Sequence, residues 1–529
     1  MAAIVTDQFR ILNASNFVDS VSDTNNNSYY VFLSLPNPSV VGYGRSTNWD
    51  SNTPSPVDNL DYLSHVKDTM VFGKKITVND VRRLVRRVDW KQGTTYEMYR
   101  HDYSISNPSP KTNSTRLYDS NYYVMNSDFR VYVCIDNGSS IEFPSGKASS
   151  DEPTFIDLEP SRAGESNDGY IWKYLFTVSP SDIIKFDSIE YIPLPNNWLT
   201  TTNAQIQSVR ENGDSLINEN QIKKIYIQDQ GSGYNSTDAE LDIIGDGEGG
   251  KVIVTTTNNK ITKAVVSAGG KNYSWGRVNL STINSGATGF AHLIPVIPPS
   301  RGHGYDIYNE LGADKVLIYA RFDDSTKDFP VDTRFAQIGV IKNPTQVGSA
   351  SSVFTENQFS NLGGVKLTSV ANPTDAGVGN QIFQTISGVG TATGYIASYD
   401  SSTKVLKYYQ DRSLYYNDNS FDQKDSKTVV DESTKVAFSK DGGTITSTNT
   451  FSGAIDVSYT GITTTVSATK KVNLATQFTE GIALPEINKG SGEIIYLDNR
   501  PRVSRNPRQK EDIKIILEFL RCHKKQILI

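Results

Sequence analysis

The stretch Asn167 to Phe176, "NDGYIWKYLF", carries an aromatic residue at every second position. These residues are Tyr170, Trp172, Tyr174 and Phe176. Alternate side chains of a β-strand point to the same face, so a strand here carries an unbroken aromatic row. An exposed row could stack sugars or bases, whereas a buried row supplies packing energy to a core or a subunit interface. We favour the second interpretation and expect the row to be structural.

The composition is typical of an all-β protein with long polar loops. The chain has 529 residues, 28 tyrosines, 37% hydrophobic residues and a formal net charge of −6. This length suggests about three domains, because it exceeds what one ordinary core accommodates. The slightly acidic balance implies no general affinity for nucleic acid.

Targeting and cross-linking signals are weak. Two cysteines, Cys134 and Cys522, provide no disulfide framework. The first ten residues, "MAAIVTDQFR", lack a basic region followed by an apolar run, and no run of 18 apolar residues occurs. We therefore expect no signal peptide, no membrane insertion and synthesis in a reducing cytoplasm.

Strand signals dominate the chain. Runs rich in β-branched and aromatic residues, mostly bounded by Gly, Pro, Asn or Asp, predict strands. They lie at 29–36, 130–136, 314–322, 335–344 and 493–501. The sequence therefore predicts a mainly β fold.

Helix signals are few, and two stretches carry them. One is 60–71, with apolar residues near helical spacing. The other is 77–88, where "TVND" predicts a capping box between Thr77 and Asp80. An apolar stripe follows at helical spacing: Val78, Val81, Leu84, Val85 and Val88.

Four arginines lie on or beside the opposite face of the helix predicted at 77–88. They are Arg82, Arg83, Arg86 and Arg87. One interpretation is a phosphate site; the other is a solvated helix face, or pairing with acids of a neighbouring chain. We favour the second, because the nearby Trp90 and Tyr96 suit an interface anchored by Arg and Trp.

Two stretches differ in character from the rest and predict insertions. Residues 203–300 hold a weak repeat of strand, Gly-rich turn with Tyr (Tyr234 and Tyr273) and strand, and "GDGEGG" within it predicts a turn. Residues 347–475 are rich in Ser, Thr, Gly and Asn, with a hairpin pattern at 390–410. The predicted domains are core segments 1–202, 301–346 and 476–529, the last ending in a basic tail, and inserted β domains 203–300 and 347–475.

Catalytic and metal motifs are missing from the sequence. The five histidines show no HxxxH or HExxH spacing, and no GxSxG, P-loop or dinucleotide fingerprint occurs. Paired carboxylates leave no such signature, since any two of 58 acids can meet in space. We expect no catalytic residue, no cofactor and no metal.

Several segments together resemble the baseplate wedge protein of T-even-like contractile-tail phages, the gene-eight product family. They occur in the family's order along 1–200, 300–346 and 476–519. The matching segments are "AIVTDQFR" from Ala3, "YGRSTNW" from Tyr43, "RRVDW" from Arg86, "VYVCID" from Val131, "NDGYIWKYLF", "EYIPLP" from Glu190, "FAQIGVIKNP" from Phe335 and "SGEIIYLDNRP" from Ser491.

The resemblance implies a layered β-sandwich core with a few helices in loops, to which the chain adds the two small inserted β domains. It also implies a homodimer within the virion's tail baseplate, assembled in the host cytoplasm from this and other wedge subunits, without catalysis, nucleic acid or membrane insertion. Such a dimer would act as a bracket that passes on rearrangement during sheath contraction.

Ten residues are candidate interface or core anchors. They are Arg45, Trp49, Arg86, Arg87, Trp90, Tyr170, Trp172, Tyr174, Tyr496 and Arg500. Two other functions stay open. The first is a receptor-binding or adhesin module with the inserted domains as tips. The second is a glycan-degrading tail enzyme.

Overall fold

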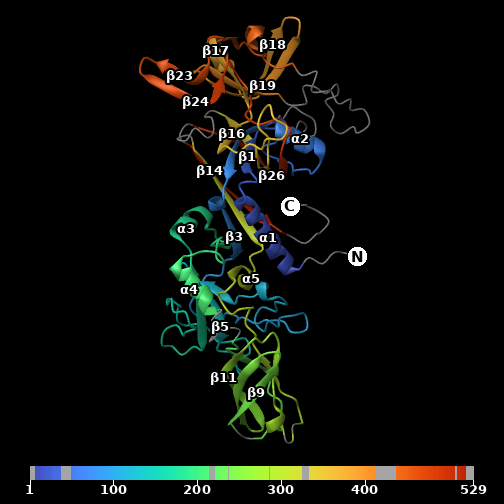
Figure 1. The fold of residues 1–529 in the computed structure, drawn as a ribbon, viewed down its shortest axis with the longest axis vertical. Coiled ribbons are helices and arrows are strands. Elements are labelled where there is room, and N and C mark those ends of the chain that lie inside the picture. The colour runs from blue at the N-terminus through green and yellow to red at the C-terminus, as the bar shows by residue number, and fades with distance from the viewer. Residues whose placement is uncertain are drawn as a thin grey trace, which may run out of the picture. The chain divides into compact units, whose positions relative to one another are not determined.

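The protein, seen here in a computed structural model, is built mainly from β-strands (Figure 1). The structure describes residues 6–36, 49–213, 221–235, 238–284, 286, 288–323, 333–410, 436–506 and 509–519. Strands make up 43% and helices 13%, which confirms the predicted mainly β class. Of the described residues, 6–18, 82–317 and 518–519 belong to compact unit 1, and 19–81 and 318–517 to compact unit 2. The five-part division into core segments and insertions stays a prediction.

The main core of unit 1 surrounds a three-stranded antiparallel sheet of order β4-β5-β6. Its strands are β4 Tyr123–Met125, β5 Arg130–Asn137 and β6 Tyr170–Thr177. Strand β3, Val81–Arg86, pairs antiparallel with β7, Tyr191–Leu194, and both contribute residues to the same core. Two sheets thus share one interior. The helices that lie wholly in unit 1 are α3 Pro180–Phe186, α4 Ala204–Gly213 and α5 Ile307–Leu311.

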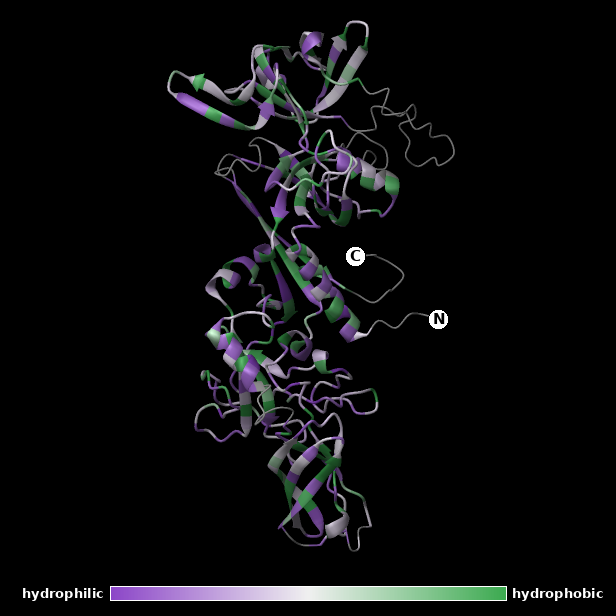
Figure 2. Ribbon diagram, viewed as in Figure 1, coloured by the Kyte–Doolittle hydropathy of each residue, from purple (hydrophilic) through white to green (hydrophobic). Residues whose placement is uncertain are grey.

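Residues 222–297 of unit 1 form a smaller sheet structure with a hydrophobic core of its own. One sheet has the order β11-β10-β9-β12, and β8 pairs with β13. Along β9 and β10 exposed and buried residues alternate for much of each strand. Figure 2 shows hydrophilic and hydrophobic residues following one another in this part of the chain. The predicted turn in "GDGEGG" is confirmed between β9 and β10. The bounds are β8 Ile225–Asp229, β9 Asp238–Gly245, β10 Glu248–Thr257, β11 Lys260–Lys271, β12 Gly276–Val278 and β13 His292–Pro295.

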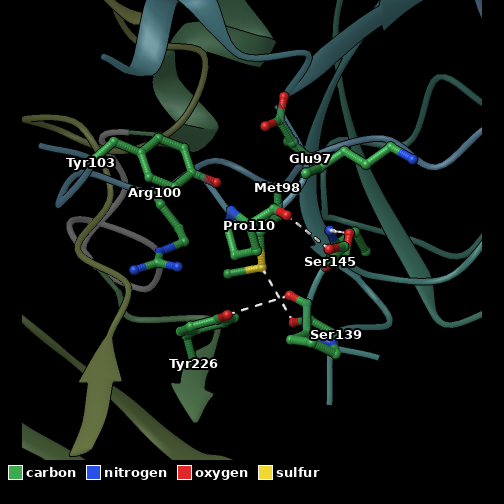
Figure 3. Close-up of a pocket in the computed structure, with 11 residues that line it drawn as sticks. Glu97, Met98, Arg100, Tyr103, Pro110, Ser139, Ser145 and Tyr226 are labelled. Atoms are coloured by element: carbon green, nitrogen blue, oxygen red, sulfur yellow. Dashed lines mark hydrogen bonds between the residues drawn. The ribbon is translucent and has the colours of Figure 1, made fainter. Parts of the chain in front are cut away.

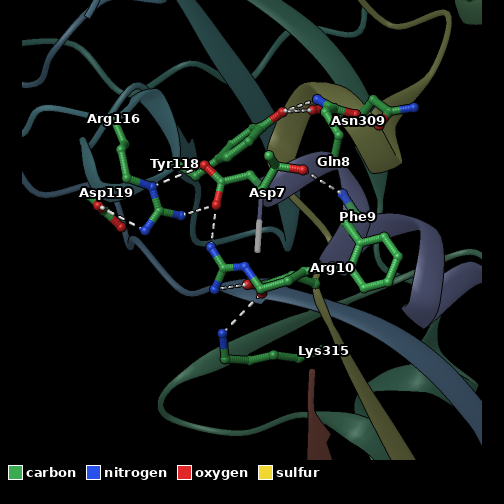
Figure 4. Close-up of polar contacts among 11 residues, drawn as sticks. Asp7, Gln8, Phe9, Arg10, Arg116, Tyr118, Asp119, Asn309 and Lys315 are labelled. Carbon is green, nitrogen blue, oxygen red and sulfur yellow. Dashed lines mark hydrogen bonds and ion pairs between the residues drawn. The ribbon is translucent and has the colours of Figure 1, made fainter. Parts of the chain in front are cut away.

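The sequence motif "DQFR" begins helix α1, Asp7–Ser22, of which residues 7–18 belong to unit 1 (Figure 4). Asp7 pairs with both Arg10 and Arg116. Arg10 Nη1 also lies 3.0 Å from Asp314 Oδ2, and Gln8 Nε2 donates to the Tyr118 hydroxyl at 3.3 Å. The first turn of the helix is therefore held by a balanced network of charges.

Unit 2 contains a five-stranded antiparallel sheet of order β16-β2-β1-β15-β26. Its core includes Tyr30 and Phe32 of β1, together with Val66 of α2. The bounds are β1 Tyr29–Ser34, α2 Leu60–Asp68, β2 Met70–Ile76, β15 Arg334–Lys342, β16 Gln358–Ser360 and β26 Glu493–Ser504. Strands β14, Lys315–Asp323, and β27, Lys510–Glu518, meet where Tyr319 and Arg321 both donate to Asp512.

Six further strands of unit 2 close into a ring, because β17 pairs with both β20 and β22. The core of this part holds aliphatic residues such as Val365 and Leu367 together with the aromatic Phe438 and Phe451. Its strands are β17 Gly363–Ala371, β18 Gln381–Ile386, β19 Gly390–Asp400, β20 Val405–Tyr409, β21 Thr444–Ser447 and β22 Ser452–Ile455. Strand β25, Ile482–Ala483, also pairs with β17, and β23 Gly461–Ser467 with β24 Lys470–Phe478 form a separate hairpin.

The five predicted strands correspond to β1, β5, β14, β15 and β26, and the hairpin at 390–410 is formed by β19 and β20. The helix predicted at 60–71 is α2, which begins after Asn59, whose side chain accepts from Tyr62 N at 2.7 Å. Strand β2 starts at Met70, so the helix is shorter than expected.

The helix predicted at 77–88 is wrong. Thr77 does bond Asp80, through N at 3.2 Å and Oγ1 at 2.7 Å, but this turn covers only Val78–Asp80, and β3 follows. Four of the five stripe residues are valines, which lose side-chain freedom in a helix and favour strands. Pairing with β7 supplies the backbone hydrogen bonds instead.

Candidate functional site

The aromatic row lies inside unit 1. Tyr170 and Trp172 are 0% exposed, Tyr174 is 1% exposed and Phe176 is 3% exposed. All four belong to the main core of that unit. Strand β6 pairs with β5 along its length, and Trp172 also forms a backbone bridge with Ser161. The row is therefore covered and offers no platform to a ligand.

The rings of the row interlock with rings from other segments. Tyr170 and Trp172 stack at 5.2 Å with an interplanar angle of 13°. Trp172 meets the edge of Tyr96 at 5.9 Å, and Phe176 meets Trp198 at 6.1 Å. Aromatic pairs in such geometries contribute about 0.5–1.5 kcal/mol each beyond the area they bury. The row thus links β6 to one loop residue that precedes it in the chain, Tyr96, and to one that follows it, Trp198.

Hydrogen bonds fix the tyrosine hydroxyls of the row. The Tyr170 hydroxyl accepts from Tyr96 N at 2.8 Å and donates to Lys147 O at 2.7 Å. The Tyr174 hydroxyl accepts from Gln205 Nε2 at 3.0 Å. Burial raises the pKa of both hydroxyls above the ordinary value. They stay neutral at physiological pH and act as structural donors and acceptors.

The other face of β6 holds a group that sequence reasoning missed. Lys173 is only 2% exposed. Its ammonium donates to Leu158 O and, at 2.5 Å, to Asn212 Oδ1. Burial lowers the pKa of Lys173 to about 8. A lysine between aromatic residues was the available signal, but sequence alternation alone assigns it to an exposed face.

Lys173 lines a small pocket that also contains Glu159 and His303. His303 Nδ1 lies 2.7 Å from Glu310 Oε1, and Gly304 N donates to Glu310 Oε2 at 2.7 Å. A buried amine of lowered pKa beside an imidazole and a carboxylate is the kind of group that acid–base chemistry uses. Here both the amine and the Glu310 carboxylate are held by bonds to their own fold.

A second small pocket is lined by Arg100, Tyr103 and Tyr226, among other residues (Figure 3). The guanidinium of Arg100 lies 4.0 Å from the centre of the Tyr226 ring, and its Nη2 donates to Asp102 Oδ2 at 2.5 Å. Arg100 Nη1 and Asn137 Oδ1 have no hydrogen-bond partner among the residues that the structure describes. Each pocket has room for little more than a water molecule, far below the roughly 300–1,000 Å³ typical of ligand sites.

The four arginines expected on a helix lie on β3 or directly after it, and they bind within unit 1. Arg82 pairs with Asp182 at 2.9 Å. Arg86 Nη1 donates to Asn121 Oδ1 at 2.8 Å, and Arg87 pairs with Asp187 at 2.8 Å. Arg83 donates to Asn196 O at 3.2 Å. Two of the four, Arg82 and Arg87, thus pair with acids of the same chain, and Arg83 and Arg86 bond a backbone carbonyl and an amide oxygen. Pairing with acids of a neighbouring chain stays a prediction.

The remaining candidate anchors differ in burial. Trp90 is half-buried beside the core of unit 1, and its Nε1 donates to Ser149 Oγ at 3.0 Å. In unit 2, Trp49 is 2% exposed and its Nε1 donates to Arg500 O at 2.8 Å. Tyr496 is half-buried and Arg500 is exposed, paired with Asp498 at 2.5 Å. Arg45 lies outside the described residues.

Neither a protein-family model nor any curated protein matches the chain. The likeness to baseplate wedge proteins therefore stays a prediction from the ordered sequence motifs. Within the described part of the chain, no helix is long and apolar enough to cross a membrane, and no group of three His, Cys, Asp or Glu side chains is placed to hold a metal ion.

Proposed function

We propose that this protein is a structural subunit of a contractile-tail baseplate wedge, a homodimeric bracket between neighbouring wedge proteins. The observation that carries the proposal is the buried row of β6, with Tyr170 and Trp172 fully enclosed. A sealed and interlocked row gives stiffness rather than recognition. The ordered sequence motifs supply the particular assembly.

The bracket transmits movement as a rigid body. Aromatic packing around β6 and internally paired arginines on β3 leave unit 1 little freedom to rearrange. Rigid subunits pass on a change by rotating about their interfaces. A permanent dimer of this kind buries on the order of 2,000 Å² or more in total. We do not propose a glycan-degrading enzyme, because the row that would hold the sugar is buried.

Removing the gene from the phage that encodes the protein tests this proposal. Tail assembly should stop at incomplete wedges, and a plasmid copy should restore complete baseplates, as seen by electron microscopy of the particles. Light scattering of the isolated chain should give the mass of a dimer at micromolar concentration. Complete baseplates without the protein would contradict the proposed function.

A receptor-binding function is the second candidate, favoured by one exposed residue. Trp275 is 54% exposed in the turn before β12. Asp246 accepts hydrogen bonds from the Ser274 hydroxyl, from Ser274 N at 2.9 Å and from Trp275 N at 3.1 Å, and these bonds lower the pKa of Asp246 to about 2. The indole is thus presented on a backbone that is already fixed, which reduces the entropy lost when a ligand binds.

Adsorption to host cells distinguishes the two candidates. The Trp275→Ala change removes the exposed indole, and Phe290→Ala removes an aromatic ring that is 81% exposed in the same part of unit 1. A receptor tip predicts that only Trp275→Ala reduces adsorption, by tenfold or more, while particles still assemble. Equal adsorption of both variants and the unchanged particle would contradict the receptor function.

A further inference from the structure

Sheet edges in this protein are protected, with one exception. Among the described strands of five or more residues that lie at a sheet edge, all but β23 contain a charged residue. The charged edge strands are β8, β11, β24, β26 and β27. The one charged residue of β6, Lys173, is buried, and a backbone bridge from Ser161 to Trp172 covers part of that edge instead. Natural proteins use such charges, prolines or short strands to prevent edge-to-edge pairing. The remaining edge strands have four residues or fewer.

Strand β23, "GITTTVS", has neither a charge nor a proline. Five of its seven residues are β-branched, from Ile462 to Val466, which is the composition that strands prefer. Thr463 and Thr465 are exposed, and Ile462 is 43% exposed. Within the described residues its one paired neighbour is β24. The strand therefore combines strong pairing tendency with an unprotected edge.

Among the described residues, the most deeply buried side chain of the β23–β24 hairpin lies at its root. Phe478 is 1% exposed, packs on Tyr459 at 5.7 Å and shares a small core with Val405 and Ala483. Toward the turn, Ser467 and Lys470 are exposed. Two-stranded hairpins are marginally stable in water by themselves, whereas three or more strands with an apolar face are stable. An additional strand on the β23 edge would give the hairpin the third strand that a stable sheet requires.

We propose that β23 pairs edge to edge with β23 of a second copy of this chain. The other edge, β24, begins with Lys470 and Lys471, which repel the same edge of another copy. Two β23 strands meeting about a twofold axis place threonines opposite threonines or valines without any charge repulsion. The product is a four-stranded sheet with β24 at both ends, where lysines protect it from further growth. This inference rests on the homodimer proposed above and assigns one of its contacts.

A spin label on β23 tests the pairing directly. The label is attached at Thr465→Cys in a Cys522→Ser background, since Cys134 is fully buried and does not react. Paired strands lie about 4.8 Å apart and seven residues span about 23 Å, so pulsed dipolar spectroscopy should find the two labels within about 25 Å. Labels farther apart, or a signal without dipolar coupling, overturn the proposal.

A charge on the same edge provides the second test. Thr465→Lys should weaken the dimer at least tenfold in sedimentation equilibrium, while circular dichroism stays unchanged because the side chain is exposed. The matched control is Thr262→Lys, an exposed threonine on the already charged edge strand β11, which should leave the dimer as it is. A dimer that Thr465→Lys leaves intact contradicts the β23 contact but not the wedge dimer. A monomeric unchanged chain contradicts both.

Discussion

Strands β6 and β23 have eight and seven residues, yet they serve opposite purposes. In β6 both faces are filled, and every aromatic ring is at most 3% exposed. In β23 the side chains are small, the face toward solvent carries threonines, and one edge is open. Two strands of nearly equal length thus form part of a core in one place and a sheet edge in the other. Side-chain size and charge, rather than periodicity, tell the two apart.

The largest effect should come from removing the centre of the aromatic row. Trp172→Ala leaves a cavity where the indole stacks on Tyr170 and meets Tyr96. We expect the free energy of unfolding of unit 1 to fall by about 4 kcal/mol, because large-to-small changes in a core cost about 3–5 kcal/mol. Urea unfolding followed by tryptophan fluorescence measures it. A loss below about 1 kcal/mol would show that the row is not core.

The root of the hairpin should behave as a small core. Phe478→Ala removes a ring that is 1% exposed beside Tyr459. We expect the hairpin to lose about 3 kcal/mol of stability, seen as faster amide exchange in β23 and β24. Exchange in β6 should stay unchanged, because that strand belongs to unit 1. Unaltered exchange in the hairpin would mean that it is anchored elsewhere.

Lys173 makes the stability of unit 1 depend on pH. Its folded pKa is about 8, below the value of 10.5 for the unfolded chain, so folding releases a proton between these values. Stability should rise with pH across pH 8 to 10.5, by up to about 3 kcal/mol relative to Lys173→Met, which cannot titrate. Urea unfolding of both proteins at pH 7.5, 9 and 10.5 measures the difference. A constant difference across that range would contradict the burial of the charge.

We expect the smallest change in unfolding free energy from a substitution in the edge strand β23. Thr465→Ala removes an exposed side chain, so the unfolding free energy of unit 2 should change by less than about 0.5 kcal/mol. Urea unfolding at a concentration where the chain is monomeric measures this. A loss of unfolding free energy comparable with that of Trp172→Ala would contradict the assignment of β6 as a core strand and β23 as an exposed edge strand.

Sequence reasoning succeeded where the size and branching of the side chains indicate that a strand is buried. The aromatic row and the apolar runs of β1 and β15 predicted strands, because bulky and β-branched residues suit a pleated, buried surface. Helix α1 was missed although Ile11, Ala14, Val18 and Val21 have helical spacing. Asparagines and serines among them favour loops and conceal the stripe.

The missed parts of the site depend on long-range partners. Whether valines at 78–88 form a helix or a strand depends on β7, more than 100 residues away, which pairs with β3. Lys173 is buried because Leu158 and Asn212 accept its hydrogen bonds, and neither position follows from the local pattern. Local propensity is decided by such tertiary contacts. The pairing of Arg82 with Asp182 and of Arg87 with Asp187 could not be predicted either, because these acids are about 100 residues away in the chain.

Hydrogen exchange of the whole chain, resolved to β6 and β23, tests the central claim most directly. If the aromatic row is a sealed structural core, amides of β6 should exchange only when unit 1 unfolds, at least about 1,000-fold more slowly than amides of β23 in the monomeric Thr465→Lys protein. Exchange in β6 as fast as in β23 would mean that water reaches the row, and the structural account of this protein would be contradicted.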